Sequence, residues 1–315
     1  MKTPDILSIG EPMVEFCATS LGRLSVVEEF RRGWGGDTSN FAVAAARLGG
    51  SSGYICRLGG DEFGRSFLDL WRREGVDASR VIVEPEGFTA VYIISLTGEG
   101  GHDFTYYRAG AAASRYSPAD LDAEYVAKAR VLHTSGISLA VSGCLREASL
   151  EAMQICREAG GMVSFDVNMR QKLWPLEVAR AVCGQAVGES DVVFASVEDT
   201  MTLFGVGEPT RAAEKLRSLG AGIAVVKRGG EGCHVSSEEP SFDSQGYSVD
   251  VVDTTGSGDA FDAAFMLGIL EGWGLERSAS FANAVGALTA TGLGAVAPIP
   301  TRERALGLMG AEGRI

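Results

Sequence analysis

The chain alternates short β-branched runs with longer stretches of helical periodicity, and no other feature restricts its fold as strongly. The short runs lie at 6–9, 53–57, 131–134, 162–166, 191–195 and 223–227, and the helical patterns between them lie at 39–48, 64–73, 146–159, 177–187 and 211–219. Strands that alternate with helices form βαβ units, in which helices cover both faces of a parallel sheet. The sequence therefore predicts one α/β domain over residues 1–315, with a central, mostly parallel sheet flanked by helices.

Two stretches lack a helix between neighbouring strand patterns. Residues 13–19 with 28–34, and 90–97 with 103–108, predict hairpin strands, and 97–101 predicts the turn of the second hairpin. Together they predict a small antiparallel sheet, with segments of about 11–37 and 88–112 inserted into the α/β domain. Such a sheet is either an elaborated edge or a lid that excludes water from a reaction.

Composition excludes several classes of protein. The net charge of −13 disfavours non-specific nucleic-acid binding, which requires a basic surface. The six cysteines are far apart without a C-x-x-C pair, and the three histidines do not cluster with them, so reduced thiols are expected and a zinc site is not. Residues 1–10 contain no apolar leader, and the most apolar tract, 279–298, is too mixed to span a membrane. These features predict a soluble, cytoplasmic protein.

The segment 251–262 carries the strongest chemical signal. A strand-like run ends at Asp253, a Gly-Ser-Gly turn follows, and an apolar helical pattern continues to about residue 270. The backbone N–H groups of Gly256, Ser257 and Gly258 are therefore expected at a helix N-terminus, where they lack intrahelical acceptors and the helix dipole favours an anion.

A carboxylate follows in the first turn of the same predicted helix. Asp259 could accept the proton of an attacking hydroxyl while the preceding amides hold a phosphate. An ordinary helix start rich in Gly, Ser and Asp is the alternative reading of this segment alone. The sequence contains neither a G-x-x-x-x-G-K-[ST] loop nor a G-x-G-x-x-G turn after the first strand, which argues against P-loop and dinucleotide-binding enzymes.

Three motifs together resemble the ribokinase-like (PfkB) carbohydrate kinases. Asp-Thr-Thr-Gly-Ser-Gly-Asp-Ala-Phe at 253–261 resembles the C-terminal signature of that family, and the Gly-Gly-Asp-Thr-Ser-Asn segment at 35–40 resembles its first signature. Gly-Gly-Asp-Glu-Phe-Gly at 59–64 resembles the element that follows the first signature. The resemblance implies a ribokinase-like fold with a small β-sheet lid, and an ATP-dependent sugar kinase that uses Mg²⁺ with Asp259 as catalytic base.

The resemblance also implies a set of nucleotide and metal positions. The ATP site would include Ser196, Lys227, Gly229, Gly232, Thr254, Gly256, Gly258 and Asn283, and Asp253 with Thr255 would hold a monovalent cation such as K⁺. The family's Asn-x-x-Glu element appears here as Ser196-Val-Glu-Asp199, so Asp199, or its neighbour Glu198, would contact Mg²⁺ through water.

Three further segments narrow the acceptor. Tyr92, the Tyr-Tyr-Arg run at 106–108 and Asp-Val-Asn-Met-Arg at 166–170 resemble the substrate segments of 2-keto-3-deoxygluconate kinases. The implied acceptor site consists of Gly35, Gly36, Asp37, Asn40, Tyr92, Tyr106, Arg108, Arg170 and Asp259. Arginine suits the carboxylate of a sugar acid, and tyrosine offers an apolar face with a hydroxyl.

Other substrates and classes remain open from sequence. A fructokinase or another hexose kinase shares the 166–170 segment, a nucleoside kinase would not call for an arginine pair, and the altered 196–199 element leaves room for a sugar-binding regulator without turnover. The exposed edges of the predicted lid could also pair two copies, so a homo-oligomer is expected.

Overall fold

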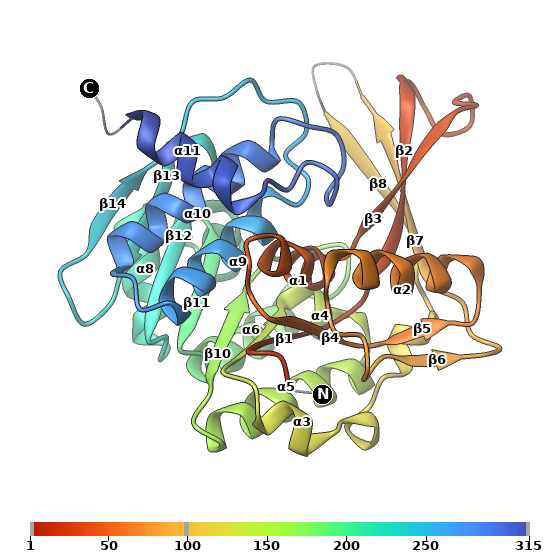
Figure 1. The fold of residues 1–315 in the computed structure, drawn as a ribbon, viewed down its shortest axis with the longest axis horizontal. Helices are drawn as coiled ribbons and strands as arrows, with labels where there is room; N and C mark the ends of the chain where they lie inside the picture. Colours follow the sequence, from red (N-terminus) through yellow and green to blue (C-terminus); the bar gives the residue numbers. More distant parts are fainter. Residues whose placement is uncertain (1–2, 98–100, 313–315) are drawn as a thin grey trace.

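A computed structural model of the chain describes residues 3–97 and 101–312, and its largest feature is an eight-stranded sheet (Figure 1). Its strands, in spatial order, are β14 (Phe242–Gln245), β13 (Gly232–Ser236), β12 (Ile223–Lys227), β11 (Val192–Ser196), β10 (Met162–Asp166), β9 (Val131–Ser135), β1 (Ile6–Ile9) and β4 (Ser52–Ile55). The six strands from β12 to β4 are parallel, whereas β13 and β14 are antiparallel additions at one edge. The predicted mostly parallel α/β sheet is confirmed.

Helices cover both faces of this sheet, as Figure 1 shows. The helices are α1 (Asp37–Arg47), α2 (Glu62–Glu74), α3 (Ala123–Ala127), α4 (Gly136–Val141), α5 (Gly143–Glu158), α6 (Leu176–Gly188), α7 (Val197–Phe204), α8 (Pro209–Ser218), α9 (Ser257–Leu270), α10 (Leu275–Thr289) and α11 (Arg302–Glu312). Short 3₁₀ turns lie at Ala112–Arg115, Pro118–Asp120 and Gly229–Glu231. Successive buried residues of a strand enter opposite cores: Val192 packs with α1, α2, α9, α10 and α11, and Val193 with the helices on the other face. This alternation follows from the two-residue period of a strand.

A separate four-stranded sheet rises from one side of the molecule (Figure 1). It consists of β3 (Phe30–Gly35), β2 (Met13–Leu21), β7 (Ala90–Leu96) and β8 (His102–Tyr107), in that order. Each predicted hairpin is present, but β2 and β7 pair in parallel, so the expected all-antiparallel arrangement is wrong. Thr97 N–H donates to the Gly101 carbonyl oxygen at 2.8 Å. Residues 98–100 of the predicted turn lie outside the described part of the chain.

Two other strand predictions are also wrong. The run 53–57 divides after Ile55, because β4 pairs with β1 whereas β5 (Arg57–Gly59) pairs with β6 (Ile82–Glu84) in a two-stranded sheet. The run before Asp253 is not a strand: 246–256 crosses the surface irregularly, with Val251 and Val252 more than half exposed. Within residues 3–97 and 101–312, no helix combines the length and apolar character needed to cross a membrane.

Candidate active site

A cavity of about 1300 Å³ opens where the parallel strands end, and residues of both the large and the small sheet line it. Eighteen predicted site residues reach its wall: Gly36, Asp37, Asn40, Tyr92, Tyr106, Arg170, Ser196, Asp199, Lys227, Gly229, Gly232, Thr254, Thr255, Gly256, Ser257, Gly258, Asp259 and Asn283. Gly35, Arg108 and Asp253 do not line the cavity. The volume exceeds the roughly 300–1,000 Å³ typical of a site for one small ligand, so two ligands can be accommodated side by side.

The amino end of α9 forms the glycine-rich wall of the cavity. Gly256 is the N-cap with φ 77°, and a Cβ at this position would lie 2.5 Å from the Ala295 carbonyl oxygen, so only glycine fits without strain. Ser257 differs from the expectation, because its N–H (3.1 Å) and its hydroxyl (2.7 Å) both donate to the Thr254 carbonyl. Among the described groups, the N–H groups of Gly256 and Gly258 have no acceptor, which leaves them available to an anion.

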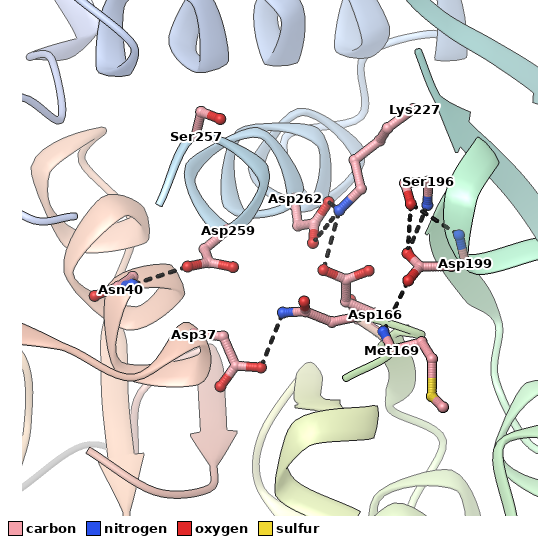
Figure 2. Close-up of polar contacts among 12 residues, drawn as sticks. Asp37, Asn40, Asp166, Met169, Ser196, Asp199, Lys227, Ser257, Asp259 and Asp262 are labelled. Atoms are coloured by element: carbon pink, nitrogen blue, oxygen red, sulfur yellow. Dashed lines mark hydrogen bonds and ion pairs between the residues drawn. The ribbon is translucent and has the colours of Figure 1, made fainter. Parts of the chain in front are cut away.

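Asp259 lies in the first turn of α9 and faces α1 (Figure 2). Asn40 Nδ2 donates to Asp259 Oδ2 at 2.8 Å, which orients the carboxylate. Burial and the nearby Asp37 raise the pKa of Asp259 to about 7, although the Asn40 hydrogen bond opposes the shift. A carboxylate with a pKa near neutrality is suited to act as a general base.

Asp37 is a second carboxylate on the cavity wall near Asp259. It occupies the first turn of α1, where Oδ1 accepts from Thr38 N–H at 2.8 Å and Oδ2 accepts from Asn168 Nδ2 at 3.1 Å. Asn168 follows β10 with φ 33°, a conformation that a non-glycine residue rarely adopts. Burial raises the pKa of Asp37 above its ordinary value. The Asp37 and Asp259 side chains both line the cavity, so a polyhydroxylated ligand would find acceptors there.

Lys227, which is predicted to contact the nucleotide, is held by two buried carboxyls at the cavity wall. Its Nζ lies 3.0 Å from Asp166 Oδ2 and 3.1 and 3.2 Å from the two Asp262 carboxyl oxygens (Figure 2). Burial alone would lower the pKa of this ammonium, but the two carboxyls hold it above its ordinary value. The side chain is thus bound within the protein beneath α9, although part of it reaches the cavity wall.

Residues 196–199 cap the amino end of α7 (Figure 2). Ser196 and Asp199 form a capping box, in which Ser196 N–H donates to Asp199 Oδ2 (2.9 Å) and Asp199 N–H donates to Ser196 Oγ (3.0 Å). The second oxygen, Asp199 Oδ1, accepts from Met169 N–H at 2.8 Å. Both Asp199 oxygens are therefore used in fixing the backbone, whereas the neighbouring Glu198 is exposed and lines the cavity.

Tyrosines of the small sheet form the acceptor side of the cavity. The Tyr92 hydroxyl donates to Glu15 Oε2 at 2.6 Å, and burial raises the pKa of Glu15 to about 7 despite this hydrogen bond. A Cβ at Gly35 would lie 2.7 Å from Tyr92 Cε1, so Gly35 gives the tyrosine ring its space from behind. At Gly36 (φ 93°) a Cβ would lie 2.9 Å from Pro12 Cα. These two glycines shape the site by close packing.

The two arginines of the predicted acceptor site differ in their surroundings. Arg108 Nη2 lies 2.5 Å from Glu11 Oε2, and both side chains are almost fully buried. Burial raises the pKa of Glu11 to about 7, and the Arg108 charge opposes that shift. Arg170, by contrast, is exposed on the cavity wall, and its Nη1 donates to the Met169 carbonyl at 3.0 Å. Among the described residues no carboxylate forms an ion pair with Arg170.

The remaining predicted residues lie along the other arm of the cavity. Asn283 Nδ2 donates to Ser244 Oγ (3.0 Å) and to the Gln245 carbonyl (3.0 Å), which attaches α10 to the end of β14. Gly229 and Gly232 have φ of 59° and 96° and form the turn between β12 and β13. Asp253 accepts from Thr255 N–H (2.9 Å) and from Gly294 N–H (2.8 Å), so its carboxylate organises the approach to α9.

Sequence reasoning missed Asp262, Glu11 and Glu15. Asp262 is fully buried one turn after Asp259, and a carboxylate inside an otherwise apolar helix was the available signal. Glu15 lies on β2, an interior strand of the small sheet, and Glu11 lies two residues before that strand, so the local sequence carries no signal of burial or pairing.

Known proteins resemble this chain over nearly its whole length. Residues 3–302 match the family described as pfkB family carbohydrate kinase. Fructokinase-1 of Oryza sativa subsp. japonica is 35% identical over 314 residues, covering 96% of this chain and 97% of that protein. The 2-dehydro-3-deoxygluconokinase of Bacillus subtilis (strain 168) is 33% identical over 311 residues, covering 98% and 96%. A crystal structure of an E. coli ribokinase II with ATP and Mg²⁺ superposes with a TM-score of 0.91 at 26% identity, covering 98% and 99%.

The chain belongs to the PfkB family of carbohydrate kinases, and its architecture is the ribokinase-like fold. It is a sugar kinase, a phosphotransferase whose acceptor is an alcohol group. Its relatives include fructokinases and 2-dehydro-3-deoxygluconokinases at similar identity.

Proposed function

We propose that this kinase transfers the γ-phosphate of ATP to a hydroxyl of 2-keto-3-deoxygluconate (2-dehydro-3-deoxygluconate) or a closely related sugar acid. The observation that carries the proposal is the exposed guanidinium of Arg170 on the cavity wall that also includes Asp259 and Tyr106. An arginine without a carboxylate partner can bind a substrate carboxylate by two hydrogen bonds. A protein of charge −13 needs such a local cation to retain an anionic substrate.

Each step of the transfer has a residue suited to it. Asp259, oriented by Asn40, takes the proton of the acceptor hydroxyl. The free N–H groups of Gly256 and Gly258 stabilise negative charge on the transferring phosphoryl group. Tyr92 and Tyr106 offer the sugar an apolar face, and Asp37 accepts from its hydroxyls. ATP would occupy the arm that contains Gly229, Gly232, Thr254 and Asn283.

The carboxylates of the site fit a nucleotide-borne Mg²⁺ better than a metal held by protein alone. Among residues 3–97 and 101–312, no group of three or more His, Cys, Asp or Glu side chains is arranged to bind a metal ion. Glu198 is the exposed carboxylate on the cavity wall, so we assign the water-mediated contact to Glu198 and a supporting role to Asp199. Bound Mg²⁺ would offset negative charge on the phosphates. A monovalent cation such as K⁺ beside Asp253 and Thr255 remains a prediction.

The small sheet would serve as a lid over the acceptor. Its contacts across the cavity include the exposed ion pair between Asp103 of β8 and Lys172 of the loop that follows β10 (3.1 Å). Exposed pairs of this kind contribute about 1 kcal/mol or less, so this contact would resist movement of the lid only weakly. Its free edges at β3 and β8 are suited to pairing with a second copy, and the cytoplasm, which supplies ATP, is the expected compartment.

A second candidate substrate is fructose or a related neutral hexose. The buried ion pair between Arg108 and Glu11 favours it, because that arginine is then unavailable to a substrate carboxylate. The comparison with Fructokinase-1 of rice supports the same alternative. A regulator without turnover is disfavoured by the intact amino end of α9 and by Asp259, and a nucleoside acceptor would leave Arg170 without a function.

An ADP-release assay with Mg-ATP against 2-keto-3-deoxygluconate, fructose, ribose and adenosine tests the proposal. We expect the keto-deoxy acid to have the highest kcat/KM. The Arg170→Ala variant should lower that value by about 10- to 100-fold, the loss of a charged hydrogen bond of roughly 1.5–3 kcal/mol, and should change turnover of fructose little. Arg72→Ala, which removes an exposed arginine of α2, is the control. A wild-type enzyme that prefers fructose, or equal losses on both substrates in Arg170→Ala, would refute the sugar-acid assignment.

A further inference from the structure

The buried lysine cluster of Asp166, Lys227 and Asp262 lies beside the first turns of α9 (Figure 2). Its members come from the end of β10, the end of β12 and the second turn of α9. The Asp262 side chain is fully buried, Asp166 is 5% exposed and Lys227 is 15% exposed. The lysine therefore joins three elements that meet under the catalytic turn.

The charges within this cluster do not balance if both carboxyls are ionised. One ammonium can neutralise one carboxylate, and a second buried anion without a cation costs several kcal/mol. A proton shared by two carboxyls resolves the imbalance, as two carboxyls at one site do not both ionise. Burial and Asp166 raise the pKa of Asp262 well above its ordinary value. Burial would also raise that of Asp166, but Lys227 and a hydrogen bond from Asp262 hold it below its ordinary value.

The hydrogen-bonding capacity of Asp166 indicates where the proton lies. Asp166 Oδ2 accepts from Lys227, while the buried Asp166 Oδ1 has no donor if every carboxyl in the described chain is ionised. A protonated Asp262 donates a hydrogen bond to the Asp166 carboxylate and still accepts from the lysine.

Within the described residues, no group other than Lys227 places a positive charge on the Asp166 and Asp262 carboxyls at neutral pH. His133 on β9 is buried and stacked on Phe41, and burial lowers its pKa to about 3, so it is neutral. Asp37 on α1, Asp199 on α7 and Asp259 on α9 are the remaining charged groups around the cluster, and all are acidic.

We propose that Asp262 is a positioning residue which, as a neutral carboxylic acid, holds the Lys227 ammonium against Asp166 beneath the amino end of α9. A Cβ placed at Gly258 would lie 3.4 Å from Lys227 Nζ, so the ammonium is next to the turn that would hold the phosphoryl group. There it places a positive charge beside the anion site and opposes the rise in the pKa of Asp259 that burial, Asp37 and Asp166 cause. The kinetic consequence rests on the proposed kinase reaction, whereas the protonation of Asp262 does not.

Two substitutions separate the neutral acid from an ionised one. Asp262→Asn keeps an oxygen that accepts from Lys227 and gains N–H groups that can donate to the Asp166 carboxylate. Asp262→Ala removes both interactions and leaves Lys227 with a single carboxylate partner, so that its flexible side chain can leave the cluster. If Asp262 is neutral, the asparagine variant should behave as the wild type and the alanine variant should not.

The kinetic arm measures kcat, KM and the pH dependence of kcat/KM for both variants. We expect Asp262→Asn to remain within about threefold of the wild-type kcat, and Asp262→Ala to lose about tenfold or more, equivalent to about 1.4 kcal/mol, with KM for the sugar little changed. The acidic limb of the pH profile should move to higher pH only in Asp262→Ala, because Lys227 no longer lowers the pKa of Asp259. Asp69→Asn, an exposed carboxylate on α2, is the control for loss of a charge.

The second arm needs no activity. Glu11, Glu15 and Asp259, with pKa values of about 7, contribute protonated-carboxyl bands to both proteins at pH 7. The infrared difference spectrum, wild type minus Asp262→Asn, should therefore show one additional protonated-carboxyl band that belongs to the wild type, and the two proteins should melt at closely similar temperatures. Absence of that band, an Asp262→Asn loss as large as that of Asp262→Ala, or an unaffected Asp262→Ala enzyme would each overturn the proposal. If no sugar is turned over, the kinase reaction fails while the spectra still decide the protonation of Asp262.

Discussion

Replacement of Asp259 by asparagine tests the reaction most directly. Asparagine has nearly the same shape, and its Oδ1 can still accept the 2.8 Å hydrogen bond from Asn40, so the corner between α1 and α9 should keep its packing. The amide cannot take a proton from the acceptor hydroxyl. We therefore expect kcat to fall by at least about 100-fold, the lower end of general-base contributions, which equals about 2.7 kcal/mol of transition-state stabilisation. The KM for the sugar should change little.

The pKa of Asp259 supplies a second measure of the same role. Since Asp259 titrates at about 7 in the folded protein, kcat/KM of the wild type should fall about tenfold per pH unit below pH 7. Asp259 in the native state binds its proton up to about pH 7, whereas in the unfolded state it releases the proton near pH 4. This group therefore makes the wild type less stable as pH rises from 4 to 7. Asp259→Asn lacks that loss and should gain stability relative to the wild type between pH 5 and pH 8.

Coupled measurement of ADP release and thermal unfolding distinguishes the outcomes. Low turnover in a variant that unfolds at or above the wild-type temperature at pH 8 is the expected result. Near-normal turnover would remove Asp259 from the role of base. Low turnover together with a large loss of stability would indicate misfolding and would refute the argument that asparagine preserves the corner.

Two further predictions concern backbone and burial. Gly256→Ala should lose at least about 1–2 kcal/mol of unfolding free energy because of the left-handed backbone, and more because of the clash with Ala295, together with most of kcat. The control is Gly205→Ala, which has φ 71° and open space around it and should show only the backbone cost. Equal losses of stability in the two variants would contradict the packing argument. His133 has a pKa of about 3 when folded and about 6.5 when unfolded, so its contribution to stability is lost as pH falls below 6.5. Between pH 7.5 and pH 5 the unfolding free energy of the wild type, measured with urea, should therefore fall by about 2 kcal/mol more than that of His133→Asn. A difference in unfolding free energy that stays constant with pH would refute the buried neutral imidazole.

Local sequence patterns were sufficient for the α/β fold. β1, β10 and β12 have the predicted bounds, because continuous apolar runs suit strands that are buried on both faces. The hairpins of the small sheet were predictable for the same local reason. The parallel pairing of β2 with β7 was not, since it joins strands that are more than 70 residues apart and no local pattern specifies the partner.

The same division holds in the site. A glycine turn, the start of α9 and Asp259 are contiguous in the chain, so the sequence by itself determined their arrangement through helix geometry. The partners of Lys227, Arg108 and Asp199 were decided only by the tertiary structure. Each of these side chains has a local interpretation as a ligand contact, yet Lys227 pairs with Asp166 and Asp262, Arg108 with Glu11, and Asp199 with the backbone of Met169. A buried charge must find an opposite charge or a donor wherever the fold provides one, and that position depends on how distant elements pack.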